Sequence, residues 1–183
     1  MMMDLAMHIL DIVYNSIRAH ARHIKLWILD SNEKNQIVIC IEDDGDGMDE
    51  EMLIKVQDPF YTSRTTRKVG LGIPFVSALA DMCEGSFKLE SNVNVGTRLT
   101  LTLKKDHIDT PPWGDIGESI ATIIQSDDGN AFYMKYEMDD ASFQFDSEEI
   151  KQELAPVSIR EAEVILWIKE YVNEGITALR RSK

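Results

Sequence analysis

The stretch Asp43-Asp44-Gly45-Asp46-Gly47-Met48 decides how the rest of this chain is interpreted. It follows the apolar run Ile37-Val38-Ile39-Cys40-Ile41, which is typical of a buried strand. A second glycine pair, in Gly70-Leu71-Gly72-Ile73, stands at the start of a stretch with helical character. Because glycine has no Cβ, both turns can bring the backbone close to a ligand, and a helix N-terminus attracts phosphate. Together the two stretches predict a site for phosphate and a purine base.

The acidic turn has two simpler explanations when it is taken alone. An acidic, glycine-containing turn after a strand is usually an ordinary turn, and sometimes part of a calcium loop. The calcium loop is excluded here, because an EF-hand needs a helix on each side and a Glu at its twelfth position. The preceding residues 37–41 have the pattern of a strand. The ordinary turn stays open until the other motifs are considered.

A helix is expected from about Leu5 to Ala21, because apolar residues recur there every three or four positions. Asp4 is available as its N-cap. Asp11, Asn15 and Arg18 are spaced so that they form a second, polar stripe on this helix. An asparagine in such a place often only hydrogen-bonds a neighbouring backbone group. The two glycine motifs favour a binding role for it.

The order of these features resembles the histidine-kinase-type ATPase superfamily, which also includes DNA gyrase, mismatch-repair ATPases and anti-sigma-factor kinases. An Asn on a helix, a strand followed by DxGxG, a polar loop, a GLG helix start and Gly96-Thr97 between two strands occur in that order. The resemblance covers roughly residues 5–104. It implies an α+β fold: a two-layer α/β sandwich whose mainly antiparallel, mixed sheet is covered on one face by helices. The segment 58–64, DPFYTSR, resembles one in bacterial sensor kinases, so sensor-kinase and anti-sigma-factor ATPase domains are the expected nearest group.

The resemblance implies ATP and Mg²⁺ as ligands and assigns roles to particular residues. Asn15 would hold Mg²⁺ through its carbonyl oxygen while the ion bridges the nucleotide phosphates. Asp43 would accept a hydrogen bond from the adenine amine, and a carboxylate, which only accepts, would reject the guanine carbonyl. The other expected nucleotide contacts are Gly45 and Gly47 near the base, Gly70, Leu71 and Gly72 at the phosphates, Arg64 and Lys68 in a lid, and Thr97 near adenine. For the lid cations solvation is an equal alternative, and for Thr97 the alternative is a strand edge.

Asp11 is the candidate catalytic base. Many ATP-cleaving relatives place a Glu one turn before the metal-binding Asn, and this chain has the shorter Asp11 there. A general base must reach its proton within hydrogen-bond distance, so base catalysis and a surface Asp paired with Asn15 or Arg18 stay equal alternatives. Val69 stands where sensor kinases commonly have Thr, so one side-chain contact to phosphate is absent. The choice between an enzyme and a nucleotide-binding module is therefore open.

Composition favours one domain with an appendage. The chain has 183 residues, 44% of them hydrophobic, and a net charge of −13, which argues against a nucleic-acid partner. Residues 1–106 carry 12 basic and 16 acidic side chains, and residues 107–183 carry 7 and 16. We expect an ATP-binding domain over 1–106 and a small α/β extension over 107–183, with a hairpin, helices and a place where a basic partner protein could dock. A homodimer stays open.

The remaining expectations concern location and function. Two cysteines, the absence of a signal-peptide pattern and the absence of a long apolar run predict a cytoplasmic protein without a membrane span. The Asn-bearing helix begins almost at Met1, so we do not expect a complete sensor kinase. The leading hypothesis is an ATP·Mg²⁺-binding cytosolic signalling protein that phosphorylates a protein partner. The alternative is a non-catalytic module whose partner affinity is set by nucleotide.

Overall fold

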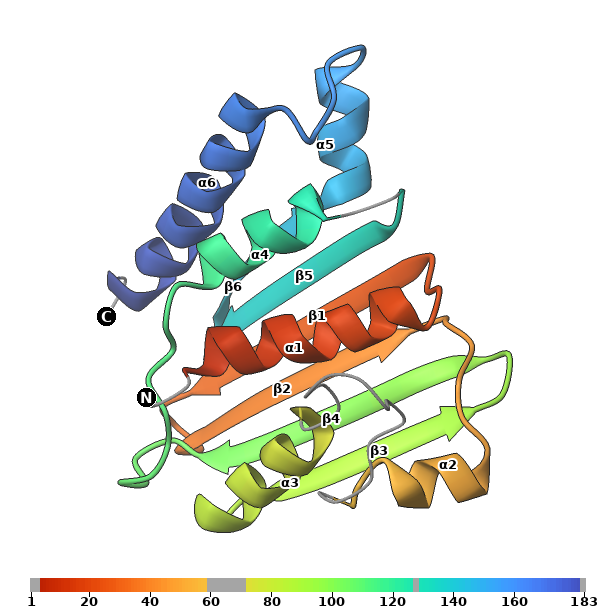
Figure 1. Ribbon diagram of the computed structural model, residues 1–183. Helices are drawn as coiled ribbons and strands as arrows, with labels where there is room; N and C mark the ends of the chain where they lie inside the picture. The colour runs from red at the N-terminus through yellow and green to blue at the C-terminus, as the bar shows by residue number, and fades with distance from the viewer. Residues whose placement is uncertain (1–3, 59–71, 127–128, 182–183) are drawn as a thin grey trace.

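The computed structural model describes residues 4–58, 72–126 and 129–181. These residues form a six-stranded sheet with the order β3-β4-β2-β1-β5-β6 (Figure 1). All neighbouring strands are antiparallel except β1 and β5, which are parallel. The strands are β1 (His23–Ser31), β2 (Gln36–Asp43), β3 (Ser86–Asn92), β4 (Gly96–Lys104), β5 (Ala131–Met138) and β6 (Ala141–Asp146). The helices are α1 (Leu5–Arg18), α2 (Glu50–Lys55), α3 (Gly72–Met82), α4 (Ile116–Gln125), α5 (Ser147–Leu154) and α6 (Ala162–Arg181).

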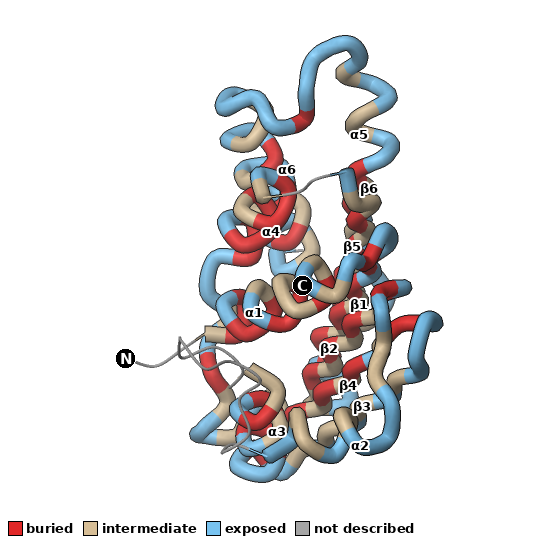
Figure 2. The backbone as a smooth tube through the Cα atoms, turned by 45° about the vertical axis from the view of Figure 1, so that its right-hand side comes forward, coloured by how far each residue is buried: buried red, intermediate tan, exposed pale blue. Residues whose placement is uncertain are grey.

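Helices α1, α3 and α4 lie over one face of the sheet (Figure 1). The strands show why: in β2 the side chains alternate between buried and half-buried, and Ile37, Ile39 and Ile41 are the buried set. Side chains of a strand point alternately to the two faces, so only one face joins the core. Figure 2 shows this buried layer running between the sheet and α1 and α4. The expected α+β sandwich with a mainly antiparallel sheet is confirmed.

Helix α1 crosses the middle of the sheet and carries the residues on which the site depends. Asp4 caps it, because its Oδ1 accepts a 2.8 Å hydrogen bond from the Met7 N–H. The helix ends at Arg18, earlier than the expected Ala21, since His20 has φ +59° and cannot continue a right-handed helix. The chain then turns directly into β1. This sharp return brings the C-terminal end of α1 beside the turn that follows β2.

The C-terminal segment extends the same sheet. The N–H groups of Leu5 and Ala6 donate to the carbonyls of Pro112 and Trp113 in the connector, at 3.0 and 2.9 Å. Ser119 of α4 donates to the carbonyl of Ala6, and apolar residues of both segments belong to one buried core. Because β5 pairs with β1, residues after the connector add two strands and a covering helix to the sheet.

A polar network built on buried Tyr136 and Asp30 connects the end of α6 to this sheet. The Tyr136 hydroxyl donates to Asp30 Oδ2 at 2.7 Å and accepts from Arg180 Nη2 at 2.9 Å. Lys105 forms an ion pair with the other oxygen of Asp30, and the Arg180 guanidinium lies 5.6 Å from the centre of the Trp113 ring. Burial, and after it the Asp30 carboxylate, raises the pKa of Tyr136 far above its ordinary value of 10.0, so this hydroxyl stays protonated. No helix in the described part of the chain combines the length and apolar character that a bilayer crossing requires.

Candidate functional site

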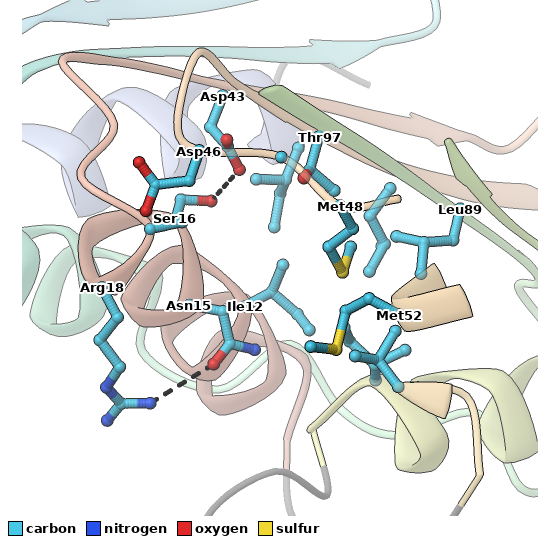
Figure 3. A pocket seen from close by; sticks show the side chains of 16 residues that line it. Ile12, Asn15, Ser16, Arg18, Asp43, Asp46, Met48, Met52, Leu89 and Thr97 are labelled. Carbon is cyan, nitrogen blue, oxygen red and sulfur yellow. Dashed lines mark hydrogen bonds between the residues drawn. The ribbon is translucent and has the colours of Figure 1, made fainter. Parts of the chain in front are cut away.

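A cavity of about 540 Å³ opens between α1, the turn after β2, α2 and strand β4 (Figure 3). Pockets that hold cofactors are typically about 300–1,000 Å³, so a nucleoside fits this volume. Most of its wall is apolar, and the polar groups gather at one side (Figure 3). The apolar lining residues are Ile12, Ala19, Ile41, Met48, Met52, Val56, Ile73, Leu89 and Leu99. This composition suits a planar base whose edge meets a few fixed polar groups.

Asp43 is the best-fixed of the polar groups. It ends β2, lies opposite Thr97 of β4 and is only 9% exposed. Its Oδ2 accepts a 2.6 Å hydrogen bond from Ser16 Oγ, and its Oδ1 accepts a 2.9 Å bond from the Gly45 N–H. A carboxylate offers about four acceptor positions, so these two bonds orient the group and leave acceptor capacity for a ligand. Asp43 lines the cavity, as the assigned contact to an adenine amine requires.

Asn15 lines the same cavity from α1, one residue before Ser16. Its Oδ1 accepts from Arg18 Nη1 at 3.4 Å, a long contact that a better ligand can replace. Gly72, the first residue of α3, lies against this part of α1. A Cβ built there would be 3.8 Å from Asn15 Nδ2 and 3.8 Å from Asp11 Cβ. The beginning of α3 therefore stands beside Asn15.

The structure places the other expected site residues as follows. Thr97 and Gly47 line the cavity, Gly45 does not, and Arg64, Lys68, Gly70 and Leu71 lie outside the described residues. Asp11 is exposed on α1, close to Gly72, and does not belong to the lining.

The two glycines of the acidic turn are needed for packing against protein backbone. A Cβ at Gly47, which has φ +66°, would overlap the carbonyl oxygen of Asn92. A Cβ at Gly45 would press against the carbonyl oxygen of Ala19 at 2.5 Å, and the Asp46 N–H donates to that same oxygen at 2.7 Å. The turn is thus held between the end of α1 and the β3–β4 hairpin. Only glycine allows this close approach, and the close packing of the turn keeps Asp43 in place.

Two serines complete the site, and the sequence alone did not reveal them. Ser16 holds Asp43, as described above. Ser91 Oγ accepts from the Met48 N–H at 2.8 Å, donates to the Gly96 carbonyl at 2.9 Å and lies 2.9 Å from Thr97 Oγ1. It therefore orients the Thr97 hydroxyl. Neither serine belongs to a motif; the one signal was that Ser16 directly follows Asn15.

The acidic residues between the motif positions have structural roles. Asp44 Oδ1 accepts from the backbone N–H groups of Arg22 and His23, at 2.7 and 2.8 Å, and its Oδ2 lies 2.7 Å from His23 Nδ1. Partial burial would raise the pKa of Asp44, but these hydrogen bonds outweigh it and hold the pKa below its ordinary value of 3.8. Asp46 Oδ2 lies 2.7 Å from His20 Nδ1. The Asp46 pair connects the turn to the segment between α1 and β1, and the Asp44 pair connects it to the first residue of β1.

The donor set fits a metal ion only in part. Among the described residues no group of three or more His, Cys, Asp or Glu side chains could hold a metal. The amide oxygen of Asn15 is a hard, neutral ligand that suits Mg²⁺ when phosphate oxygens supply the remaining ligands and the negative charge. The residues present therefore fit an ion that arrives with a nucleotide.

A buried carboxylate and a helix-borne amide line one mainly apolar cavity, which suits a nucleotide-binding site. The comparison with known families agrees: the model of the family described as histidine kinase-, DNA gyrase B-, and HSP90-like ATPase matches residues 3–107. The chain belongs to this family, and membership implies nucleotide binding.

Several curated sensor kinases are similar to this part of the chain. Sensor protein RprX of Bacteroides fragilis is 31% identical over 108 residues, covering 53% of this chain and 21% of the relative. Sporulation kinase D of Bacillus subtilis is 33% identical over 95 residues, covering 52% and 19%. Sensor histidine kinase YvrG of Bacillus subtilis is 26% identical over 99 residues, covering 52% and 17%. The chain spans 17–21% of the length of these three relatives.

Among solved structures, the crystal structure of the N terminal domain of a DNA repair protein aligns with a TM-score of 0.47 and 16% identity. The alignment covers 78% of this chain and 51% of that one.

Proposed function

We propose that this chain binds ATP together with Mg²⁺ and acts in signalling by phosphorylating a protein partner. The observation that carries the proposal is the convergence of Asp43, Asn15 and the start of α3 around one cavity of nucleoside size. In this arrangement Asp43 accepts a hydrogen bond from the adenine amine. Hydrogen bonds from Ser16 and the Gly45 N–H keep the Asp43 carboxylate in position. The apolar wall excludes water from the base and so strengthens that hydrogen bond.

Among the described residues, we assign two neutral groups to the phosphate end. Asn15 holds the ion through its amide oxygen, and the N–H groups at the start of α3 meet the phosphate oxygens. The ion supplies positive charge that offsets the charge of the phosphates. In this proposal Asp11, one turn before Asn15 and close to Gly72, takes a proton from a hydroxyl or imidazole group of the partner. Similarity to sensor kinases supports a protein as that partner.

A second function is a nucleotide-gated binding module. One observation favours it: Asp11 is exposed and does not belong to the described lining of the cavity. In that case ATP sets the affinity for a partner and no phosphate is transferred. In both cases we propose a cytoplasmic protein, since Cys40 and Cys83 are free thiols, as in a reducing compartment.

The test is calorimetric titration with ATP, ADP and GTP, each with and without Mg²⁺. We expect ATP to bind more tightly than GTP, and Mg²⁺ to strengthen ATP binding. Asp43→Asn should weaken ATP binding about tenfold, because a hydrogen bond to a charged group contributes about 1.5–3 kcal/mol. Asp49→Asn is the matched control: it removes one charge near the site, and asparagine is an equally good cap for α2.

Equal affinity of the unaltered protein for ATP and GTP would contradict the role of Asp43. Binding that is the same in Asp43→Asn and Asp49→Asn would contradict it as well.

A further inference from the structure

Helices α5 and α6 enclose an apolar groove of about 360 Å³ near the β6 edge of the sheet, far from the nucleotide cavity (Figure 1). The segment that joins the two helices and much of α5 are exposed (Figure 2). The groove is lined by Ile150, Glu153 and Leu154 of α5 and by Glu163, Val164 and Trp167 of α6. Its floor is aliphatic, and its two charged lining residues have the same sign.

Trp167 is an exposed aromatic that is already fixed in place. The side chain is 43% exposed, and its ring stacks on Tyr171 with centroids 4.9 Å apart and planes 15° apart. Tyr171 in turn meets the edge of Phe143 of β6 at 5.3 Å. A ring held by its neighbours loses little freedom when a partner covers it, so it is a low-cost anchor for binding.

Both charged residues that line the groove are acidic. Within the described residues, neither Glu153 nor Glu163 forms an ion pair. Glu163 lies in the first turn of α6, where the helix dipole favours it, but Glu153 lies in the last turn of α5, where the dipole opposes a negative charge. Nearby lysines are engaged elsewhere: Lys151 pairs with Glu148, and Lys169 pairs with Glu118 of α4. The groove therefore has an apolar floor and an acidic rim.

We propose that this groove binds an amphipathic helix with basic flanks, presented by a partner protein. The apolar face of such a helix would cover Trp167, Val164 and Leu154, and its Lys or Arg side chains would reach Glu153 and Glu163. A second copy of this chain is a poor occupant, because a symmetric contact would bring acidic rims together in a chain of net charge −13. An anionic lipid surface is disfavoured by the same charges.

The test uses a fluorescently labelled peptide of about 18 residues, five helical turns, with Leu on one face and Lys on the other. Its affinity for the full chain is measured by anisotropy without nucleotide, so the result does not depend on ATP binding. The comparison peptide has Glu in place of every Lys. We expect the Lys peptide to bind, with an affinity that falls as the salt concentration rises. The Glu peptide should not bind.

Two pairs of variants localise the binding. Trp167→Ala should lower affinity about thirtyfold, the effect of truncating a hot-spot aromatic. Leu166→Ala, at the next position and 62% exposed but outside the lining, should change it less than about twofold. The double variant Glu153→Gln/Glu163→Gln should lower affinity about tenfold and flatten its salt dependence. Glu170→Gln/Glu174→Gln removes the same charge from α6 outside the groove and should have little effect.

Three results would overturn the proposal. The Glu peptide could bind as well as the Lys peptide, or the two double variants could weaken binding equally, which would mean general attraction to an acidic protein. The unaltered chain could dimerise and become monomeric in Trp167→Ala, which would make a second copy the occupant. Circular dichroism and urea unfolding check each variant, and the glutamine variants keep the test valid if Trp167→Ala unfolds.

Discussion

Ser16 Oγ donates a 2.6 Å hydrogen bond to Asp43 Oδ2 and so joins α1 to the end of β2 across the nucleotide cavity (Figure 3). Both residues are buried. Because Ser16 directly follows Asn15, this one bond also fixes the distance between the expected metal ligand and the expected base contact. Two adjacent residues of α1 therefore serve the site: Asn15 lines the cavity, and Ser16 orients Asp43.

Replacing Ser16 with Ala should weaken both folding and ATP binding. Asp43 would keep only the Gly45 N–H as a donor, and a buried acceptor without its partner costs about 1–3 kcal/mol of unfolding free energy. Urea unfolding and ATP titration measure the two effects. Ser142→Ala, at an exposed position of β6, is the control and should change the unfolding free energy by less than about 0.5 kcal/mol. Identical behaviour of the two variants would mean that the bond does not hold the site.

Asp11→Asn separates the catalytic function from the binding module. If Asp11 is the base, transfer of label from γ-labelled ATP to a partner protein should fall by about a hundredfold or more, while ATP affinity stays within about twofold. Asp81→Asn on the exposed side of α3 is the matched control. Transfer at the normal rate in Asp11→Asn would exclude it as the base. An absence of transfer by the unaltered protein, with ATP bound, would favour the module.

Gly47→Ala should destabilise the chain more than Gly129→Ala does. Both glycines have positive φ, +66° and +108°, so both substitutions carry backbone strain of about 1–3 kcal/mol. Only at Gly47 does the new Cβ overlap a backbone oxygen, that of Asn92, whereas a Cβ at Gly129 meets no described atom within 4 Å. The difference in urea midpoint therefore isolates the close approach of the turn to β3. Equal loss of stability would show that the turn can move away from Asn92.

The pair formed by Asp44 and His23 predicts an acid-sensitive part of the stability. The pKa of Asp44 is held below 3.8 in the folded protein, so its contribution is fully present above that pH. It is lost as the pH falls through the lower, folded value. The difference in unfolding free energy between the unaltered protein and Asp44→Asn should thus be constant from about pH 7 to pH 4 and shrink below it. Asp140→Asn, at the exposed β5–β6 turn, should show no such change; a difference that grows on acidification would reverse the assigned sign.

Tyr136→Phe should loosen the end of α6. It removes the hydroxyl that donates to Asp30 and accepts from Arg180, and so leaves a buried carboxylate oxygen without that donor. The expected loss of unfolding free energy is about 1–3 kcal/mol. Tyr133→Phe, on the same strand but on the half-buried face, is the control and should cost less than about 0.5 kcal/mol. Hydrogen exchange of the α6 amides should rise only in Tyr136→Phe.

Much of the fold could be predicted because its signals are local. The apolar run at 37–41 and the cap at Asp4 each depend on neighbours in sequence, and the structure contains the corresponding strand and helix. The glycines of the acidic turn were also recognisable from the sequence, which assigned them to close approach of a ligand. In the structure they allow close approach of other backbone segments. Gly45 makes room for the Ala19 carbonyl, a contact between segments that no local pattern contains.

The sequence by itself determined local elements and the family, because periodicity and caps are properties of short stretches and the order of the motifs can be read along the chain. The roles of Asn15 and Asp43 in a nucleotide site stay a prediction from the sequence. Only the tertiary structure decided that β5 pairs in parallel with β1, since strands so far apart in the chain share no local pattern that sets their register. It also decided that Ser16 orients Asp43, that Asp11 stays outside the cavity, and that α5 and α6 form an acidic groove. Each of these depends on the direction in which a side chain points after packing, and packing is settled by the whole chain at once.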